Sequence, residues 1–589
     1  MSLFSELKRR SVFKVGGAYL VVTWVVIQVA DTVAPQLSLP EWVPRFVTLL
    51  LLLGFPVALV LAWIFDVTPE GIRADTTTNG NRRVVAVGVV MAVAMAGWYW
   101  TRTDTGIGAA AEARSIAVLP FVNMSGDPDQ EYFSDGISEE ILNVLARAPD
   151  LRVAARTSSF AFKGENIEVP DIARALQVGM VLEGSVRKQD ERVRITAQLI
   201  DAETGFHVWS ESYDRDLEDI FAVQDEIAGA IGDELKIRVG GERASGATAV
   251  TVDPRAYDLY LKGLALWRTR TDQGLLEAVE DLEQAISIDQ DFARAYGGLA
   301  LVYSVLADYT PQISYEAAFG LGRDAGERAL ALDPTLPEAF AALGNIAVAD
   351  GRKATGLALL ERAISLSPSF ASAHQWLGTG LVPAGRLSEG LAALERAYAL
   401  DPRSIVVADN YATMLLVADR YEAAIEVCRE PLEADTETWL CRNVDVMARL
   451  HEFGPEGARS SMMRWATRAG PGPERQAEEV LAALEGLGDA YAVARRIVGL
   501  PVRASTDPEA GVLFQLIEAP SLLVLLGQPE LAYEYMERSA AQRYGFPDWG
   551  LVMPGVDPLR CEPRFRTLVE RLGMVDPRFE QVCGGANVP

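Results

Sequence analysis

Histidine is scarce in this sequence, and the common catalytic motifs are missing. The three histidines, His207, His374 and His451, fall in a predicted strand, a repeat helix and the helical tail. The chain has no G-x-S-x-G elbow, Walker phosphate loop or H-E-x-x-H pair, which mark serine hydrolases, nucleotide hydrolases and zinc peptidases. These absences argue against an enzyme, a bound cofactor and a metal site. His374 is better explained as a contact or packing residue than as a base, because it lacks catalytic partners.

Basic residues are also in short supply. The chain has 54 Lys and Arg against 81 Asp and Glu, a net charge of −27. A protein that binds nucleic acid needs a basic face to displace the counterions of the phosphates. The acidic excess therefore argues against a nucleic-acid partner.

Cysteine is rare and confined to the last third of the chain. Cys428, Cys441, Cys561 and Cys583 form no C-x-x-C pair of the kind used for zinc or redox work. They could be small buried hydrophobic residues. In an oxidising compartment, Cys428 with Cys441 and Cys561 with Cys583 could instead form disulfides. The sequence leaves both interpretations open.

Long apolar runs are present only near the amino terminus, at 12–30, 46–65 and 84–100. The first would extend about 28 Å as a helix, which is enough to cross most hydrocarbon cores. The third is shorter but ends in aromatic residues, as membrane segments often do at the interface. We expect a membrane anchor over 1–105 with three transmembrane helices, and the lipid bilayer as a partner.

Basic residues flanking these runs indicate an orientation. Positions 8–10 are all basic, and three arginines lie within 73–83. Both flanks are expected on the cytoplasmic side, since short cytoplasmic segments carry the excess of Lys and Arg. Three crossings would then place the chain beyond residue 101 outside the cytoplasm.

A small α+β domain is predicted over 115–240. Its strands alternate with helical patterns, and a polar break at 188–191 between two strands is typical of a hairpin. The predicted strands are 115–122, 151–155, 180–187, 192–200 and 207–215, and the predicted helices are 134–148, 170–178 and 219–237.

Three stretches of this domain resemble a TolB-like amino-terminal domain. They read SIAVLPFVNMSGDPDQEYFSDGISEEILNVLAR, RVAARTSSFAFKG and VLEGSVRKQDERVRITAQLIDAETGFHVWSESYDR. The domain thus resembles a bacterial module that lies outside the membrane, between a membrane anchor and tetratricopeptide repeats. That module occurs in adenylate-cyclase-like and membrane-integrated regulator proteins. The first hundred residues resemble the anchor of that group, although no cyclase or winged-helix domain precedes them here. The resemblance implies binding or sensing, in a multi-pass bacterial inner-membrane protein that is mainly periplasmic.

An acidic cluster lies near the start of this domain. Asp127, Asp129, Glu131 and Asp135 stand in a glycine-containing loop, and spaced carboxylates of this kind can bind calcium. The D-x-D-x-D-G register with its distal Glu is incomplete, however. The cluster fits better with a solvated loop that leads into a helix, because Asp and Ser are common at helix amino termini.

A repeat of 34 residues begins after the α+β domain. Pro334, Pro368 and Pro402 end the similar segments LALDP, ISLSP and YALDP, and a Leu-Gly pair recurs at 343–344 and 377–378. This period is typical of tetratricopeptide repeats, in which paired helices stack. We predict an all-α solenoid of five repeats within 255–437, followed over 438–589 by degenerate helical repeats and a carboxy-terminal cap.

The first helix of each repeat is expected to line a concave groove. By phase, the groove would present Arg294, Leu301, Glu338, Asn345, Gln375 and Thr379. These side chains lack the basic set that clamps a peptide carboxylate, so we expect a protein or peptide held mainly by apolar pockets. The leading hypothesis is a membrane-tethered protein-interaction scaffold. A sensory or regulatory subunit of a transmembrane signalling system and a cryptic enzyme in the α+β domain remain as alternatives.

Overall fold

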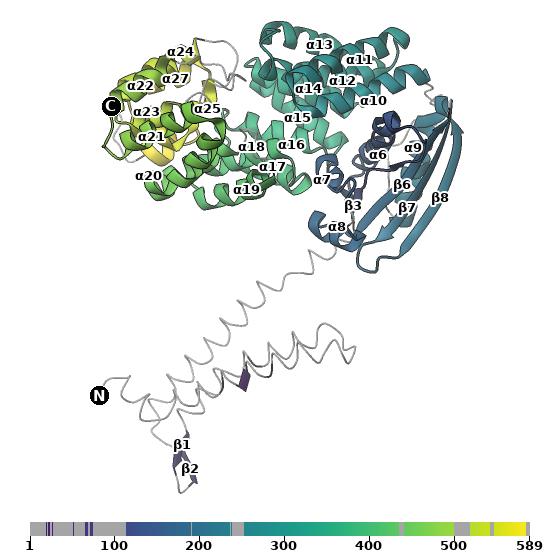
Figure 1. Ribbon diagram of the computed structural model, residues 1–589, viewed down its shortest axis with the longest axis horizontal. Helices are drawn as coiled ribbons and strands as arrows, with labels where there is room; N and C mark the ends of the chain where they lie inside the picture. Colours follow the sequence, from purple (N-terminus) through teal and green to yellow (C-terminus); the bar gives the residue numbers. More distant parts are fainter. Residues whose placement is uncertain are drawn as a thin grey trace. The chain divides into compact units, whose positions relative to one another are not determined.

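The computed structural model divides the chain into two compact units, Met1–Ala111 and Glu112–Pro589 (Figure 1). In the second unit it describes residues 114–584, except for 166, 190, 236, 238–251, 435–440, 500–518 and 542–546. In the first unit it describes only 19, 22, 23, 26, 51, 65–68 and 71–74.

The prediction of three transmembrane helices needs correction. Among the residues that the structure describes, no helix is both long and apolar enough to span a bilayer. The predicted spans 12–30, 46–65 and 84–100 lie almost wholly outside those residues. Where the second span should end, Phe65 instead begins strand β1 (Phe65–Thr68), which pairs with β2 (Gly71–Ala74) in an antiparallel hairpin. The structure therefore does not support the predicted multi-pass inner-membrane localisation or the bilayer as a partner.

The second unit opens with a six-stranded mixed sheet. Its strand order is β5-β3-β6-β7-β8, with β4 paired to β6. The β3 strand runs parallel to β5 and β6, whereas β6, β7 and β8 form an antiparallel meander. The strands are β3 (Ser115–Val118), β4 (Val122–Asn123), β5 (Arg152–Val153), β6 (Met180–Gln189), β7 (Arg192–Asp201) and β8 (His207–Asp216). The predicted hairpin is confirmed, with Met180 opposite Asp201.

Alternation along the strands gives this sheet two different faces. Ile116 and Val118 share an apolar cluster with the long helices, whereas Ala117 and Leu119 belong to a second cluster on the other face. This follows from the two-residue period of a strand, which points successive side chains to opposite faces. The helices of the domain are α6 (Glu131–Leu145), α7 (Arg156–Phe160), α8 (Val169–Leu176) and α9 (Ile220–Leu235).

Five antiparallel helix pairs follow, and they confirm the tetratricopeptide prediction. Figure 1 shows the pairs following one another, with the α+β domain at the amino-terminal end of the array and the carboxy-terminal helices at the other end. The first helices of the pairs are α10 (Pro254–Thr269), α12 (Ala293–Tyr309), α14 (Pro337–Ala349), α16 (Ala371–Leu381) and α18 (Ile405–Val417). The second helices are α11 (Asp272–Ile288), α13 (Tyr315–Leu332), α15 (Lys353–Leu366), α17 (Leu387–Leu400) and α19 (Tyr421–Ala434).

Glycine at a fixed phase lets the two helices of a pair approach closely. A Cβ added at Gly344 would lie 2.7 Å from Leu360 Cγ, and one at Gly378 would lie 2.6 Å from Leu394 Cγ. Both distances are shorter than van der Waals contact, so a larger residue would displace a fully buried leucine. The recurring Leu-Gly pair in the sequence thus marks the closest approach within these two repeats.

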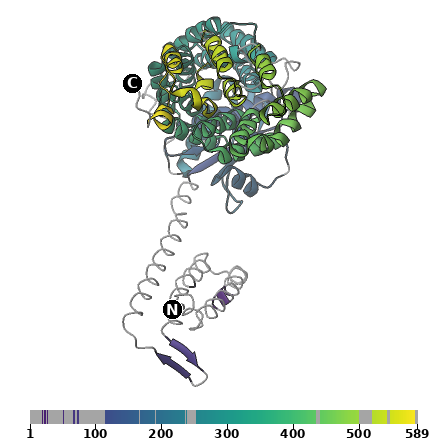
Figure 2. The same cartoon turned by 90° about the vertical axis from the view of Figure 1, so that its left-hand side faces the viewer.

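The described residues beyond the array fold into carboxy-terminal helices, which face the viewer in Figure 2. Their long first helix, α20, bends at Gly454, whose positive φ of 69° interrupts the helix. These helices are α20 (Arg442–Ala469), α21 (Pro471–Leu484), α22 (Ala490–Gly499), α23 (Ala519–Leu525), α24 (Pro529–Ala540), α25 (Pro547–Val552), α26 (Asp557–Arg560), α27 (Pro563–Arg571) and α28 (Phe579–Cys583).

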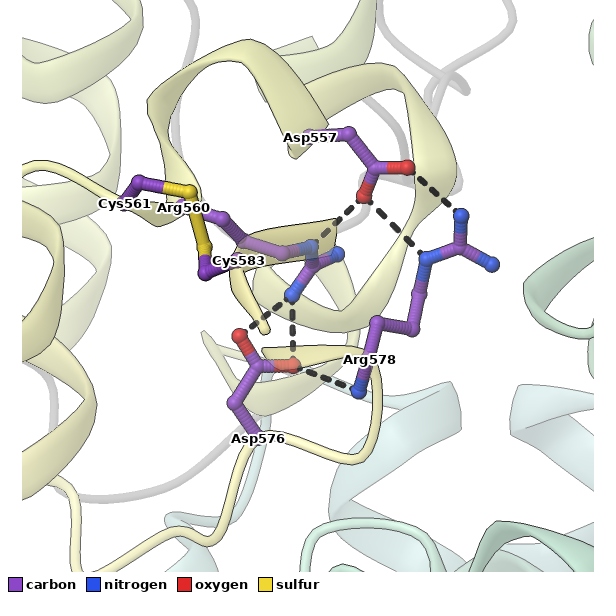
Figure 3. The surroundings of a disulfide bond; sticks show 6 residues. All are labelled: Asp557, Arg560, Cys561, Asp576, Arg578 and Cys583. Atoms are coloured by element: carbon purple, nitrogen blue, oxygen red, sulfur yellow. Dashed lines mark hydrogen bonds and ion pairs between the residues drawn. A yellow bond between two sulfur atoms is a disulfide. The ribbon is translucent and has the colours of Figure 1, made fainter. Parts of the chain in front are cut away.

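Two buried arginines and a disulfide organise the end of the chain (Figure 3). Arg560 and Arg578 are almost fully buried. Arg560 Nε donates to Asp557 Oδ1 at 2.6 Å, and its Nη1 donates to Asp576 at 2.6 Å. Cys561 is bonded to Cys583, which fastens α28 to the end of α26. The charges are tolerated at this depth because each guanidinium is paired with carboxylates.

We predict that Gly344→Ala destabilises the protein by about 1–3 kcal/mol, since the added methyl group overpacks the helix pair. Gly320→Ala in α13 is the matched control, because a Cβ at Gly320 meets nothing within 4 Å. That change should leave the free energy of unfolding unchanged or raise it by about 0.4–1 kcal/mol, because alanine reduces the conformational entropy of the unfolded chain. Urea unfolding followed by circular dichroism measures both, and equal effects would contradict the close-approach argument.

Candidate functional site

The most extensive constellation of buried polar groups lies where the α+β domain meets the first repeats. Helix α6 packs against α10, and one apolar cluster runs through both domains. The rings of Phe133 and Phe221 each meet Tyr257 edge-on, with centroid separations of 6.4 and 5.3 Å. Edge-to-face contacts between aromatic rings add to the energy of apolar burial. The α+β domain and the array are therefore joined by a shared core.

Two adjacent glutamates of α6 enter this interface. Glu139 and Glu140 are 5% and 2% exposed, which is unusual for carboxylates. Glu140 forms an ion pair with Arg294 of α12 and accepts a hydrogen bond from the Tyr260 hydroxyl at 3.0 Å. Glu139 forms ion pairs with Arg268 of α10 and with Arg156 of α7, the latter at 3.0 Å.

Burial and pairing act in opposite directions on these arginines. Burial alone lowers the pKa of Arg294, but the Glu140 carboxylate together with Tyr260 and Glu338 outweighs it, so the net shift is upward. The Arg294 guanidinium also stacks 4.3 Å above the Phe221 ring. The pKa of Arg268 falls to about 9, because it is desolvated and lies near Arg270. Arg294 is therefore the more firmly charged of the two.

A second polar contact lies at the other end of α6. Asp258 of α10 accepts hydrogen bonds from the Tyr132 hydroxyl and from Lys188 Nζ, both at 2.8 Å. These bonds lower the pKa of Asp258 against the opposing effect of burial. The contact extends the docking surface from α6 to strand β6.

A third contact joins α7 to the turns between later repeats. Ala155 N donates to the Leu400 carbonyl at 2.8 Å, and Ser158 donates to Asp401 Oδ1 through its N–H and its hydroxyl, at 3.1 and 2.7 Å. Further along, Val153 N donates to Ser369 Oγ at 3.2 Å. Burial raises the pKa of Asp401 to about 6. The sheet edge at β5 is thereby covered by the array.

The six residues predicted to line the groove are not equally available. Arg294 is engaged with Glu140, and Glu338 lies close enough to Arg147, just beyond the carboxy-terminal end of α6, for the two to interact electrostatically. Leu301 and Gln375 are buried. Asn345 and Thr379 are half-buried, and they donate to the carbonyls of Ser304 and Trp376 at 3.3 and 3.1 Å. Residues near the amino-terminal ends of α12 and α14 thus face the chain's own α+β domain.

This docking surface was not among the features predicted from the sequence. The available signal was the pair of adjacent glutamates, Glu139 and Glu140, in the predicted helix 134–148. They lie among apolar positions of that helix, and buried glutamates are rare unless they are paired. Two of their arginine partners, Arg268 and Arg294, lie more than a hundred residues away in the sequence. No local pattern could have paired them.

The acidic cluster and His374 make contacts within the protein. Lys163 Nζ pairs with Glu131 and Asp135, at 2.8 and 2.6 Å, while Asp127 caps a short 3-10 helix. In the described part of the chain, no three His, Cys, Asp or Glu residues are placed to hold a metal ion. His374 Nε2 lies 2.9 Å from the Pro368 carbonyl, and burial lowers its pKa.

The cysteines divide into one bonded pair and one free pair. Cys561 and Cys583 form the disulfide described above, whereas Cys428 and Cys441 are unbonded and fully buried. Burial raises the pKa of Cys428 well above its usual value. These two thiols adjoin the last helix pair.

Comparisons with known proteins give one partial relative and a set of similar folds. No family model matches the chain. Over 199 residues it is 45% identical to a protein of Rhizobium meliloti (strain 1021) described as putative adenylate cyclase 3. That match covers 34% of each protein, so the chain spans about a third of the length of its curated relative.

Among solved structures, a thermophilic tetratricopeptide protein of Thermus thermophilus is 18% identical, with a TM-score of 0.29. The similarity covers 33% of this chain and 99% of that one. Pseudomonas aeruginosa PilF is 17% identical, with a TM-score of 0.28 and coverage of 36% and 93%.

We predict that Glu140→Ala lowers the free energy of unfolding by about 3–5 kcal/mol, because it leaves the Arg294 charge buried without its partner. Urea denaturation measures the loss. Asp291→Ala is the control, since the Asp291–Arg328 pair is solvent-exposed and should contribute little. Replacing both partners, as Glu140→Leu with Arg294→Met, should recover much of the loss. If Glu140→Ala costs no more than the control, the pair does not hold the interface.

We also predict a pH dependence from Asp401. Its folded pKa of about 6 lies above the ordinary unfolded value of about 3.9. The folded state therefore binds more protons in this window, and wild-type stability should fall as pH rises from about 4 to about 6. Asp401→Asn keeps an oxygen to accept from the Ser158 N–H but carries no charge. Its stability, measured by urea unfolding, should fall less over that window. An unchanged slope would contradict this assignment.

Proposed function

We propose that this chain is a protein-binding scaffold, in which the tetratricopeptide array holds the α+β domain and presents a surface to a partner protein or peptide. The observation that carries the proposal is the docking of α6 on α10 and α12. Through Arg268, Arg294 and Tyr260, which all lie on first helices of the repeats, the array already binds a folded domain. Because that domain covers Arg294, the partner would contact later first helices, near Asn345 and Thr379.

The residues at the interface between the α+β domain and the array support a role in binding rather than in catalysis. The buried carboxylates of the interface are matched by arginines or hydroxyl donors, as in Glu140 with Arg294 and Tyr260. A catalytic carboxylate needs access to a substrate, whereas Glu140 is 2% exposed. The arrangement fixes two domains together, which is the task of a scaffold.

A second candidate is a sensory or regulatory subunit of a signalling system. The similarity to the putative adenylate cyclase favours it, although only about a third of that protein is covered. The resemblance of residues 115–215 to a TolB-like module would fit the same role. In this case the partner is a nucleotide cyclase or a transcription regulator. Formation of cyclic AMP from ATP by the purified chain alone would contradict both candidates.

We predict that a photo-crosslinking amino acid at Thr379 captures a partner in the native cell, and that one at Glu361 does not. Thr379 is half-buried on a first helix, whereas Glu361 is exposed on second helix α15. The measurement is mass spectrometry of the crosslinked products, compared position by position. Capture of a cyclase or regulator would favour the second candidate. Equal or absent capture at both positions would contradict binding along the first helices.

A further inference from the structure

Cys428 and Cys441 meet at the junction between the last helix pair and the carboxy-terminal helices. Cys428 lies in α19, and Cys441 immediately precedes α20. Both side chains are fully buried in the same apolar cluster. Helices α19 and α20 pack against each other, and each thiol shifts the pKa of the other, so the two side chains lie close together inside the protein.

The surroundings hold Cys441 in this position. Its backbone N–H donates to Asp409 Oδ1 of α18 at 2.7 Å, and its own φ of 64° places it in the left-handed region. This conformation is unfavourable for a residue with a side chain, so the packing of α18 and α20 must enforce it. Asp409 and Asp445 are the charged groups that act on the thiols.

The other cysteine pair gives a reference within the same chain. Cys561 and Cys583 are bonded in the folded structure, so this fold accommodates an intrachain disulfide. The Cys428–Cys441 pair shares with it the proximity of the two side chains. It differs in that its two sulfur atoms are not bonded to each other.

We propose that Cys428 and Cys441 are a site of oxidation that forms a second intrachain disulfide and covalently joins α19 to α20. The oxidant is a low-molecular-weight disulfide such as oxidised glutathione. The Cys441 thiolate attacks it, forming a mixed disulfide and releasing one glutathione thiolate. The Cys428 thiolate then attacks Cys441 Sγ, which forms the protein disulfide and releases the second glutathione. The two cysteines are oxidised, one glutathione disulfide is reduced, and the two thiol protons pass to the released glutathiones.

The order of attack follows from the effect of each thiol on the other. The neighbouring Cys428 thiol lowers the pKa of Cys441 and so opposes the effect of its burial. Cys428 lacks this help, and burial raises its pKa further. Since both sulfurs are buried, reaction with the oxidant requires local opening at the start of α20. The bond would prevent the last helix pair from separating from the carboxy-terminal helices.

Peptide mapping of the full-length chain tests the proposal directly. The chain is reduced under native conditions, incubated with oxidised glutathione, alkylated with iodoacetamide and digested with trypsin without reductant. Cleavage after Arg420, Arg429 and Arg442 puts the two cysteines on separate peptides, YEAAIEVCR and EPLEADTETWLCR. We expect these peptides to be recovered joined by a disulfide. Recovery of both as alkylated or glutathione-bearing peptides, or joined to the Cys561 or Cys583 peptides, would overturn the proposal.

Cysteine variants test whether the Cys428–Cys441 disulfide stabilises the junction between α19 and α20. Oxidation should raise the Tm of the wild-type chain by a few degrees, because the crosslink restricts the unfolded chain. Cys428→Ser should abolish this rise. The double variant Cys561→Ser with Cys583→Ser is the matched control and should still yield the linked peptides. If a variant does not fold, the peptide mapping of the wild-type chain still tests whether the disulfide forms. A Tm rise that persists in Cys428→Ser would refute the assignment to this pair.

Discussion

The buried ion pairs between α6 and the first repeats are the constraint on which the second unit depends. Taking Glu140 and Arg294 out of water is costly, and the cost is offset only while each remains the other's partner. The apolar cluster around Tyr257 supplies the driving force for docking, but it is non-directional. The ion pairs add direction, because a shifted interface would leave charges buried alone. They therefore fix where the α+β domain sits on the array.

The array is held at its far end as well. Val575 N donates to the Pro383 carbonyl at 3.0 Å, and Ala384 and Val575 form an isolated parallel β-bridge. Arg578 reaches Asp419 at 3.0 Å, next to the carboxy-terminal end of α18. The carboxy-terminal segment thus binds the turns within later helix pairs, while α7 binds the turns between pairs. Solenoid repeats normally contact only their neighbours, so these long-range contacts make the array stiffer than its repeat pattern alone implies.

The sequence was informative where the pattern is local. Strand alternation located the β6–β7 hairpin, and the 34-residue spacing of Pro334, Pro368 and Pro402 located the helix pairs. Apolar runs near the amino terminus predicted membrane helices, which no described helix supports, and Phe65 lies in a strand instead. The docking surface was not predictable, because Glu140 and Arg294 are 154 residues apart in sequence. The repeat phase predicted Arg294 for a partner-binding groove, and in the structure Arg294 pairs with Glu140 of the same chain.

Docking in cis restricts how the array could serve a partner. A partner that needed Arg294 would have to displace α6, and α6 is part of the sheet domain's own core through Ile137 and Ile141. Displacement would therefore require the whole α+β domain to leave, exposing Tyr257, Phe292 and the arginines together. Binding on the later first helices carries no such cost. A partner held there would contact the array with the α+β domain still attached, so the two domains would act on it as one body.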